Sequence, residues 1–393
     1  MKVACIGNTN NNLFSLVRYL RDRGVDADLL LLDNETEHFH PSADTFDRDF
    51  ESYTRTVPWG SAYPLHRVPA DRIRSDLEPY DFLIGCSTAP AATQRIGRRL
   101  DIFAPFGGDF YAWPFFRIVH PRHQVAWCRF HRTQRAGIQA ARCINIAATN
   151  EATEAVLRRL AFRGERLNTG IPMVYTPLYN PETIARYYDR SEGYPEFRRL
   201  RAEHDLVVFH HGRHIWKNAP DRFSWKGTDR LLRGFATFLR AEPGSRACLV
   251  TFEYGSDVQA SRDLVAELGI AERVHWFPRM ARKEIMVGLS LADVATGEFH
   301  HSWLVCGTIY EAQALAKPLL HYREDRLYEG HVPELYPLMN AREPEEIAAA
   351  LGDYVRRPGQ YREMGRRGRE WFQRYAVDES VEAYLRVIGA QRP

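Results

Sequence analysis

Residues 3–32 read VACIGNTNNNLFSLVRYLRDRGVDADLLLL, and this stretch decides the fold class. An apolar run at 3–7 is followed by a polar turn at 8–12 and by apolar residues at helical spacing; Gly24 then ends the helix before a second apolar run at 27–32. Two such strands joined through a helix lie parallel, because a crossover of this length returns the chain to the same edge of the sheet. The stretch therefore predicts a β-α-β unit.

The same pattern recurs along the rest of the chain. Continuous apolar runs at 82–85 and 102–105 add buried strands to the first half, and runs at 206–210, 247–252, 274–277 and 292–296 alternate with helical segments in the second half. We predict an α/β protein with two doubly wound, Rossmann-like domains, residues 1–185 and 200–370, joined by a proline-rich connection. Residues 371–393 are predicted to form a helix that crosses back to the first domain.

Two doubly wound domains that face each other place the carboxyl ends of both sheets at one cleft, which is where open α/β sheets bind ligands. We therefore expect the functional site between the domains.

Composition excludes several classes of protein. The chain has 393 residues, 45% of them hydrophobic, and 53 basic against 50 acidic residues give a formal charge of only +3, which argues against nucleic-acid binding. The six cysteines form no C-x-x-C pair, and no stretch has the length and apolarity of a signal peptide or a membrane span. We expect a cytoplasmic protein, with peripheral contact at the inner membrane face left open.

Arg213 and Lys226 are the first candidate site residues. Arg213 follows the apolar run at 206–210, and Lys226 directly precedes a helix that begins near Thr228, so both would project from the carboxyl edge of the second sheet. A guanidinium and an ammonium group in one place suit a diphosphate and can stabilise it as it departs. The alternative is two solvated surface cations. Lys226 is one of five lysines in this arginine-rich chain, which slightly favours the functional interpretation.

A second candidate segment begins at Gly307 and Thr308. These residues can open a short helix ahead of Pro318, and the free N–H groups of its first turn would offer an anion site. Glu311 then lies near that turn and could accept hydrogen bonds from ribose hydroxyls. Alternatively, Glu311 only stabilises the N-terminus of the helix electrostatically.

These motifs, in this order, resemble the donor-binding half of the retaining GT-B glycosyltransferases of glycosyltransferase family four. The resemblance covers residues 205–320 best, and extends more faintly to the N-terminal β-α-β unit and the C-terminal helix. It implies a hexosyltransferase-type enzyme that takes a nucleotide-diphosphate sugar as donor, retains the anomeric configuration and requires no metal or other cofactor. The family's phosphate-binding arginine and lysine fall on Arg213 and Lys226, and its ribose-binding glutamate on Glu311.

The sequence departs from the family pattern at two positions. The glutamate that contacts the donor sugar falls on Trp303, and we expect Glu298, or His300 or His301 beside it, to take over that role. The family's His-Gly-x-Asp segment falls on residues 106–109, where Phe106 replaces the histidine.

Asp109 matches the aspartate of that segment and could activate an acceptor hydroxyl or stabilise a positive anomeric centre. Alternatively, it is a loop aspartate that accepts from backbone N–H groups. The family's glycine-rich loop falls on residues 8–12, where asparagines could bind an acceptor or form a capped turn. The predicted acceptor-side residues are Asn10, Asn11, Asn12, Gly107 and Gly108.

The histidine pairs at 210–211 and 300–301 are not predicted to bind metal, because neighbours in a strand point to opposite faces. Two further functions remain open beside the glycosyltransferase. A sugar-nucleotide 2-epimerase uses a similar scaffold, and a catalytically weak nucleotide-sugar-binding subunit would explain the substitutions at Phe106 and Trp303.

Overall fold

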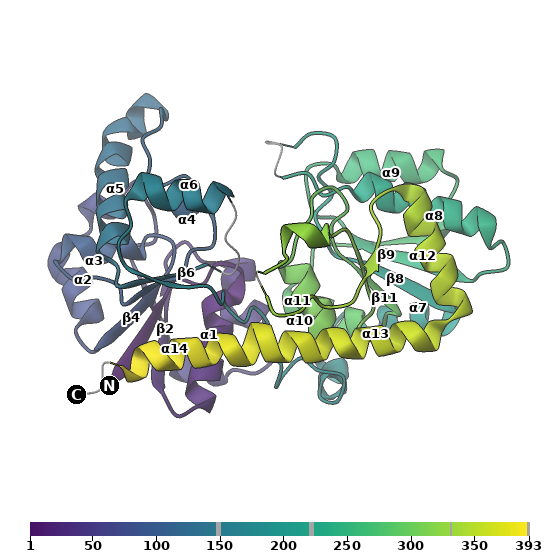
Figure 1. Ribbon diagram of the computed structural model, residues 1–393, viewed down its shortest axis with the longest axis horizontal. Coiled ribbons are helices and arrows are strands. Elements are labelled where there is room, and N and C mark those ends of the chain that lie inside the picture. The colour runs from purple at the N-terminus through teal and green to yellow at the C-terminus, as the bar shows by residue number, and fades with distance from the viewer. Residues whose placement is uncertain (147–150, 220–223, 331, 391–393) are drawn as a thin grey trace. The chain divides into compact units, whose positions relative to one another are not determined.

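The structure is a computed structural model that describes residues 1–146, 151–219, 224–330 and 332–390. The chain forms two compact units (Figure 1). The first contains Met1–Tyr175 together with Tyr375–Pro393, and the second contains Thr176–Arg374. Both are built on parallel sheets, as the apolar runs predicted.

The sheet of the first unit has the strand order β3-β2-β1-β4-β5-β6-β7 within the described residues. Its strands are β1 (Lys2–Ile6), β2 (Asp26–Leu32), β3 (Thr54–Val57), β4 (Phe82–Gly85), β5 (Ile102–Phe103), β6 (Cys143–Asn145) and β7 (Glu165–Leu167). Its helices are α1 (Asn12–Asp22), α2 (Ala70–Leu77), α3 (Ala89–Arg95), α4 (Gly108–Tyr111), α5 (Pro121–Ala140), α6 (Glu151–Leu160) and α14 (Glu379–Gly389). The opening segment forms β1, α1 and β2 as predicted, with β1 and β2 parallel.

Side chains alternate across this sheet and form a core on each face. Ala4 and Ile6 of β1 belong to a cluster with residues of α2, α3 and α5, whereas Val3 and Cys5 belong to a second cluster with residues of α1 and α14. A sheet that is apolar on both faces must be covered on both, which explains why its strands read as continuous apolar runs. The first unit is therefore doubly wound.

The sheet of the second unit has the strand order β10-β9-β8-β11-β12-β13 within the described residues. Its strands are β8 (Leu206–His210), β9 (Ala247–Phe252), β10 (Val274–Phe277), β11 (Val294–Thr296), β12 (Leu319–His321) and β13 (Met339–Asn340). Its helices are α7 (Tyr194–Glu203), α8 (Thr228–Ala241), α9 (Val258–Glu267), α10 (Arg282–Leu291), α11 (Gly307–Ala314), α12 (Pro344–Arg356) and α13 (Pro358–Trp371).

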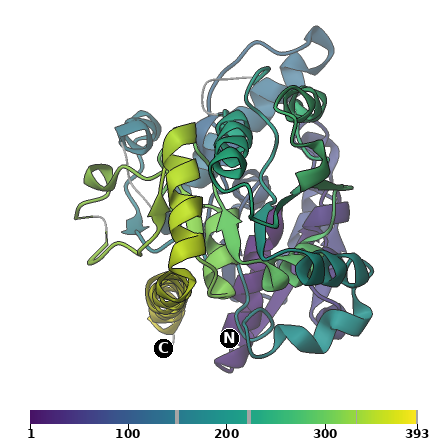
Figure 2. The ribbon, with the colours of Figure 1, turned by 90° about the vertical axis from the view of Figure 1, so that its right-hand side faces the viewer.

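This sheet too is covered on both faces, as its own helices show in Figure 2. Leu206 and Val208 of β8 pack in one cluster with residues of α8 and α12. On the other face, Phe197 of α7 lies 5.9 Å from Phe209 and stacks on Phe277 with ring centroids 4.5 Å apart. The second unit is therefore doubly wound like the first.

The last helical segment of the chain returns to the first unit. A π-helical segment, Phe372–Asp378, separates α13 from α14, and the division between the units falls inside it. Three apolar residues of α14 are buried there: Val381, Tyr384 and Val387 are each at most 6% exposed. None of the helices that the structure describes combines the length and the hydropathy required to span a bilayer.

Candidate functional site

The loop after β8 carries Arg213, and hydrogen bonds of buried polar groups fix its conformation. The His214 ring, fully buried, lies 2.9 Å from both Ser261 Oγ and Thr251 Oγ1. The Asp257 carboxylate accepts hydrogen bonds from the backbone N–H groups of Trp216, Lys217 and Asn218. Arg213 itself is exposed, and its guanidinium has no partner within the described residues.

The segments that carry Arg213 and Lys226 are neighbours. The Lys226 N–H donates to the carbonyl oxygen of Ile215 at 2.7 Å, and Thr228 Oγ1 donates to the carbonyl oxygen of Arg213 at 3.4 Å. The backbone therefore brings the predicted phosphate-binding pair to one edge of the second sheet. Helix α8 begins at Thr228, as predicted, and Gly227 occupies its N-cap position.

Gly227 lets the Lys226 loop approach the loop that follows β11. Its φ of +74° lies in the left-handed region, and a Cβ atom there would come within 2.8 Å of the His300 nitrogen. The Lys226 carbonyl accepts a hydrogen bond from the Phe299 N–H at 2.9 Å. No other residue type combines this backbone conformation with so close a contact at low cost.

Lys226 and Glu298 form the central ion pair of this edge. Lys226 Nζ lies 2.6 Å from Glu298 Oε1, and the two side chains are only 13% and 12% exposed. Glu298 Oε2 is buried and has no hydrogen-bond partner within the described residues. The Lys226 Nζ also lies 5.9 Å from the centroid of the Trp303 ring. One carboxylate oxygen thus positions the ammonium group, and the other remains able to accept a hydrogen bond.

His321, which the sequence analysis did not select, fixes this loop from β12. Its Nδ1 accepts from the Glu298 N–H at 3.0 Å, and its Nε2 lies 2.9 Å from the Trp303 carbonyl oxygen. Burial lowers the pKa of His321 to about 4, so the ring stays neutral and donates from Nε2. A histidine at the end of a short apolar run was the available signal in the sequence.

Glu311 is buried in a network of its own. Its carboxylate lies 2.7 Å from His211 Nε2 through one oxygen and accepts from Arg282 Nε at 2.7 Å through the other. Burial alone would raise the pKa of Glu311, but Arg282 and then His211 outweigh it and hold the pKa at about 2. Both oxygens are engaged, so contact with a ribose remains a prediction. Sequence reasoning missed Arg282, which lies 29 residues before Glu311.

Gly307 opens α11, as predicted, with Cys306 as its N-cap residue. Thr308 Oγ1 lies 3.2 Å from Cys306 Sγ. The helix ends at Ala314, and Ala316 adopts a left-handed φ of +54° before Pro318. The position of these residues agrees with an anion site at the first turn of the helix, whose occupation remains a prediction.

His210 and His211 point apart as strand geometry predicted, whereas His300 and His301 lie in the loop after β11, where that geometry does not apply. His210 Nδ1 lies 2.7 Å from Thr296 Oγ1, whereas His211 points to Glu311. The rings of His300 and His301 lie edge to face. Neither pair is part of a potential metal cluster among the described residues.

In the first unit, Asp109 lies in α4 and is fully buried. Its carboxylate accepts from the backbone N–H groups of Ser87, Gly107 and Phe106 at 2.8, 3.0 and 3.1 Å. Burial raises the pKa of Asp109 to about 7, although the three backbone donors oppose the rise. This geometry favours the alternative of a loop aspartate, and a catalytic role remains a prediction.

The asparagine segment forms a tight turn. Asn10 and Asn11 both have positive φ, 56° and 58°, a conformation that asparagine tolerates better than most residues. Asn11 Nδ2 donates to the carbonyl oxygen of His38, and Asn8 Oδ1 accepts from the Phe14 N–H. Asn10 is exposed, whereas Asn12 begins α1 and is buried. Of the predicted acceptor-side asparagines, Asn10 is therefore the one that faces solvent.

Gly107 and Gly108 form the turn that leads into α4. Gly107 has a φ of +140° and is the N-cap residue, and a Cβ atom there would meet nothing within 4 Å. The adjacent Phe106 is 37% exposed and lies edge to face with Trp113 at 5.9 Å.

These two doubly wound units define a two-domain GT-B α/β fold, as predicted. Among solved structures, the chain is similar to HepE (Alr3699) of Anabaena in complex with UDP-glucose, with 15% identity, a TM-score of 0.62 and coverage of 99% of this chain and 100% of that one. A glycosyltransferase from Rickettsia africae shares 11% identity at a TM-score of 0.62, over 99% and 98% of the two chains. UDP-GlcNAc 2-epimerase of Neisseria meningitidis, bound to UDP-GlcNAc, shares 10% identity with this chain at a TM-score of 0.58, over 100% of both chains.

No protein-family model matches the sequence. No curated protein matches it either. At identities of 10% to 15%, the likeness to the solved structures establishes the fold.

The first prediction concerns Gly227. Gly227→Ala forces an alanine into the left-handed region and pushes its Cβ against the His300 nitrogen, so we expect the free energy of unfolding to fall by more than about 1 kcal/mol. Urea denaturation measures the change. Gly244→Ala is the matched control, because nothing lies within 4 Å of its Cβ position. Equal stabilities of the two variants would contradict this account of the loop.

The second prediction concerns the buried carboxyl of Asp109. Because folding raises its pKa from the usual value near 4 to about 7, its contribution to stability is largest below about pH 4 and is lost as the pH rises through about 7. Asp109→Asn should show a shallower fall in the free energy of unfolding between about pH 5 and pH 8, measured by urea denaturation. Asp71→Asn, whose side chain is 92% exposed, serves as control. Identical slopes in Asp109→Asn and the unmodified protein would refute the assignment.

Proposed function

We propose that this protein is a retaining glycosyltransferase, related to family four, that moves a hexose from a nucleoside-diphosphate sugar to a hydroxyl group. The acceptor would be a saccharide, a lipid-linked saccharide or a small molecule. One observation carries the proposal: the backbone joins the segments of Arg213 and Lys226 at the carboxyl edge of the second sheet. The similarity to HepE, whose structure contains UDP-glucose, supports a nucleotide sugar as ligand.

The two cations would act on the leaving group. As the bond between the anomeric carbon and the diphosphate breaks, its electron pair passes to the diphosphate oxygen, and Lys226 and Arg213 stabilise that charge. The acceptor oxygen then attacks the anomeric carbon from the face that the diphosphate has left, and its proton passes to a phosphate oxygen. This route retains the anomeric configuration and needs no metal ion, because the two side chains supply the positive charge.

Glu298 has two roles in this proposal. Its Oε1 holds the Lys226 ammonium group in place, and its unpartnered Oε2 would accept a hydrogen bond from a hydroxyl of the donor sugar. A buried acceptor without a partner costs free energy that a ligand hydroxyl can recover. Glu298 would thus replace the glutamate that the family has at the position of Trp303. Gly307 and Thr308 would offer backbone N–H groups to the diphosphate, with Glu311 near the ribose.

The third prediction tests the leaving-group role. Lys226→Ala should lower kcat by about 10²- to 10³-fold in assays with a panel of sugar nucleotides and acceptors, because the departing diphosphate loses one of the two cations proposed to stabilise its charge. Lys2→Ala, in the first unit and paired with Asp28, is the control and should keep full activity. Undiminished turnover in Lys226→Ala would reject the role of this lysine.

A sugar-nucleotide 2-epimerase is the alternative enzyme, favoured by the similarity to the 2-epimerase of Neisseria meningitidis. Incubation of the donor without any acceptor separates the two activities, because only an epimerase then converts one sugar nucleotide into its 2-epimer. A nucleotide-sugar-binding subunit without activity is favoured by the backbone-bound Asp109 and by Phe106 and Trp303. Calorimetry that finds tight donor binding without turnover would support it.

We also propose that the enzyme works in the cytoplasm and contacts the inner membrane face through one surface of the first unit. Phe116, Ile118 and Val125 are 60%, 88% and 66% exposed. On α5, exposed arginines at 122, 129 and 132 share one helix face with Val125, and residues 113–142 contain no Asp or Glu. Apolar side chains enter the headgroup region while arginines attract anionic lipids, so this surface suits an anionic bilayer.

The fourth prediction tests this surface by vesicle flotation. The protein should float with vesicles that contain phosphatidylglycerol, and replacement of Phe116, Ile118 and Val125 by serine should weaken binding about tenfold or more, because the apolar contact is lost. The control replaces Leu327 and Val355, exposed apolar residues of the second unit, by serine. Equal binding by the triple variant and the control would contradict the proposed surface.

A further inference from the structure

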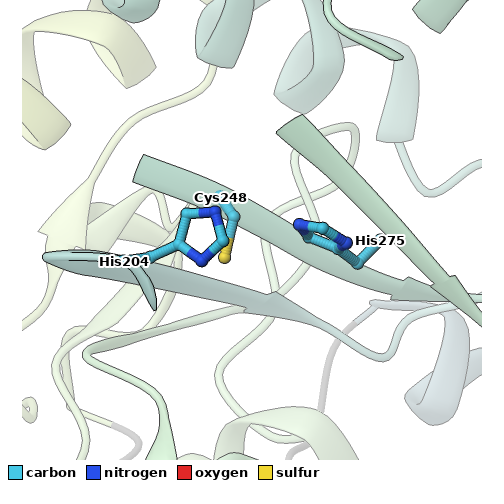
Figure 3. A group of neighbouring side chains, drawn as sticks. All are labelled: His204, Cys248 and His275. Carbon is cyan, nitrogen blue, oxygen red and sulfur yellow. The ribbon is translucent and has the colours of Figure 1, made fainter. Parts of the chain in front are cut away.

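Three metal-ligating side chains converge at the amino edge of the second sheet, the edge opposite to the candidate site. They are His204, which directly follows α7, Cys248 of β9 and His275 of β10 (Figure 3). Their potential ligand atoms all lie within 4.8 Å of one another. Because β8, β9 and β10 are parallel neighbours, their amino ends meet at one edge, which brings these three residues together.

The alternation of side chains puts the three residues on one face of the sheet. Ala247 and Leu249 of β9, with Val274 of β10, belong to the core cluster on the α8 side. Cys248 and His275 therefore point to the opposite face, which α7 covers. Since α7 ends at Glu203, the next residue, His204, reaches the same place.

The two rings are already prepared to act as ligands. His204 Nδ1 lies 3.0 Å from the carbonyl oxygen of Leu200, to which it donates, so its Nε2 is left with a free lone pair. A histidine that binds a metal is oriented by such a contact to a backbone carbonyl. His275 Nε2 is buried and has no hydrogen-bond partner within the described residues. The Cys248 thiol is fully buried and free.

Three arginines lie near the cluster, and Arg199 and Arg201 are neutralised by ion pairs, whereas Arg273 Nη1 donates to the Ala247 carbonyl oxygen at 3.5 Å. Arg199 bonds to the carboxylates of both Glu196 and Glu203. Arg201 Nη1 lies 2.6 Å from Asp293 Oδ2. Two of these three positive charges are thus balanced by carboxylates.

We propose that His204, Cys248 and His275 bind a Zn²⁺ ion that ties β8, β9, β10 and the end of α7 together. One sulfur and two imidazole nitrogens suit Zn²⁺, whereas Mg²⁺ and Ca²⁺ require oxygen ligands. Bond lengths of about 2.0 to 2.3 Å place tetrahedral ligands about 3.3 to 3.6 Å apart, so side-chain shifts of about 1 Å close the site. The Cys248 thiol gives its proton to water as the Zn–S bond forms, and water fills the fourth position.

The fifth prediction tests this site with cobalt as a spectroscopic probe. The full chain, freed of metal by a chelator, should bind one equivalent of Co²⁺ and develop a thiolate-to-cobalt charge-transfer band. Cys248→Ser should abolish that band. His204→Gln or His275→Gln should lower the affinity for Zn²⁺, measured by its displacement of Co²⁺, at least about tenfold. Cys128→Ser and His66→Gln, both in the first unit, are the matched controls and should bind like the unmodified protein.

Thermal unfolding gives a second measurement that does not depend on spectroscopy. Zn²⁺ should raise the melting temperature of the unmodified chain and of the two controls, but not that of Cys248→Ser. A missing charge-transfer band in the unmodified protein at saturating Co²⁺ would overturn the proposal, whether or not the variants fold. A band that persists in Cys248→Ser would overturn it as well, because the metal would then be bound elsewhere.

Discussion

The candidate site depends on one residue, Lys226, whose backbone N–H, carbonyl oxygen and side-chain ammonium group all form hydrogen bonds. Its N–H donates to the loop after β8, its carbonyl accepts from the loop after β11, and its ammonium group bonds to Glu298 of that second loop. A single residue thus links the two central loops of the carboxyl edge. The close approach requires glycine at the next position, where φ is +74°. The position of the Lys226 ammonium group therefore depends on the loop conformation that Gly227 permits.

Two buried carboxylates of the second unit, Glu298 and Glu311, differ in how completely their oxygens are satisfied. Both oxygens of Glu311 are used by Arg282 and His211, so this carboxylate contributes to a closed network. Glu298 uses one oxygen for Lys226, and the other is buried without a partner. A buried polar atom without a partner is costly unless something binds to it. Because only Glu298 has an oxygen without a partner, it is favoured over Glu311 as the carboxylate that would bind a ligand.

The sequence predicted the fold well where the strands are long, apolar and buried on both faces. The runs at 206–210 and 247–252 became β8 and β9 with the predicted bounds. Strands such as β3 (Thr54–Val57), β7 (Glu165–Leu167) and β13 (Met339–Asn340) were missed, because two to four residues of mixed polarity carry no periodic signal. Local order in the sequence selected Arg213, Lys226 and Glu311, and their roles remain predictions. The partners of Glu311 and the role of His321 depend on contacts between distant segments, which no local pattern encodes.

The carboxyl edges of the two sheets are organised by opposite kinds of group. In the first unit, buried carboxylates hold loops through backbone donors: Asp109 accepts from three N–H groups, and Glu35 accepts from those of Asn8 and Leu32. Burial raises the pKa of both carboxyls to about 7. In the second unit, carboxylates at the corresponding edge are paired with cations, Glu298 with Lys226 and Glu311 with Arg282, and Arg213 is exposed. An exposed guanidinium at such an edge attracts a diphosphate. The exposed guanidinium of Arg213 therefore agrees with the proposal that an anionic donor binds at the carboxyl edge of the second unit.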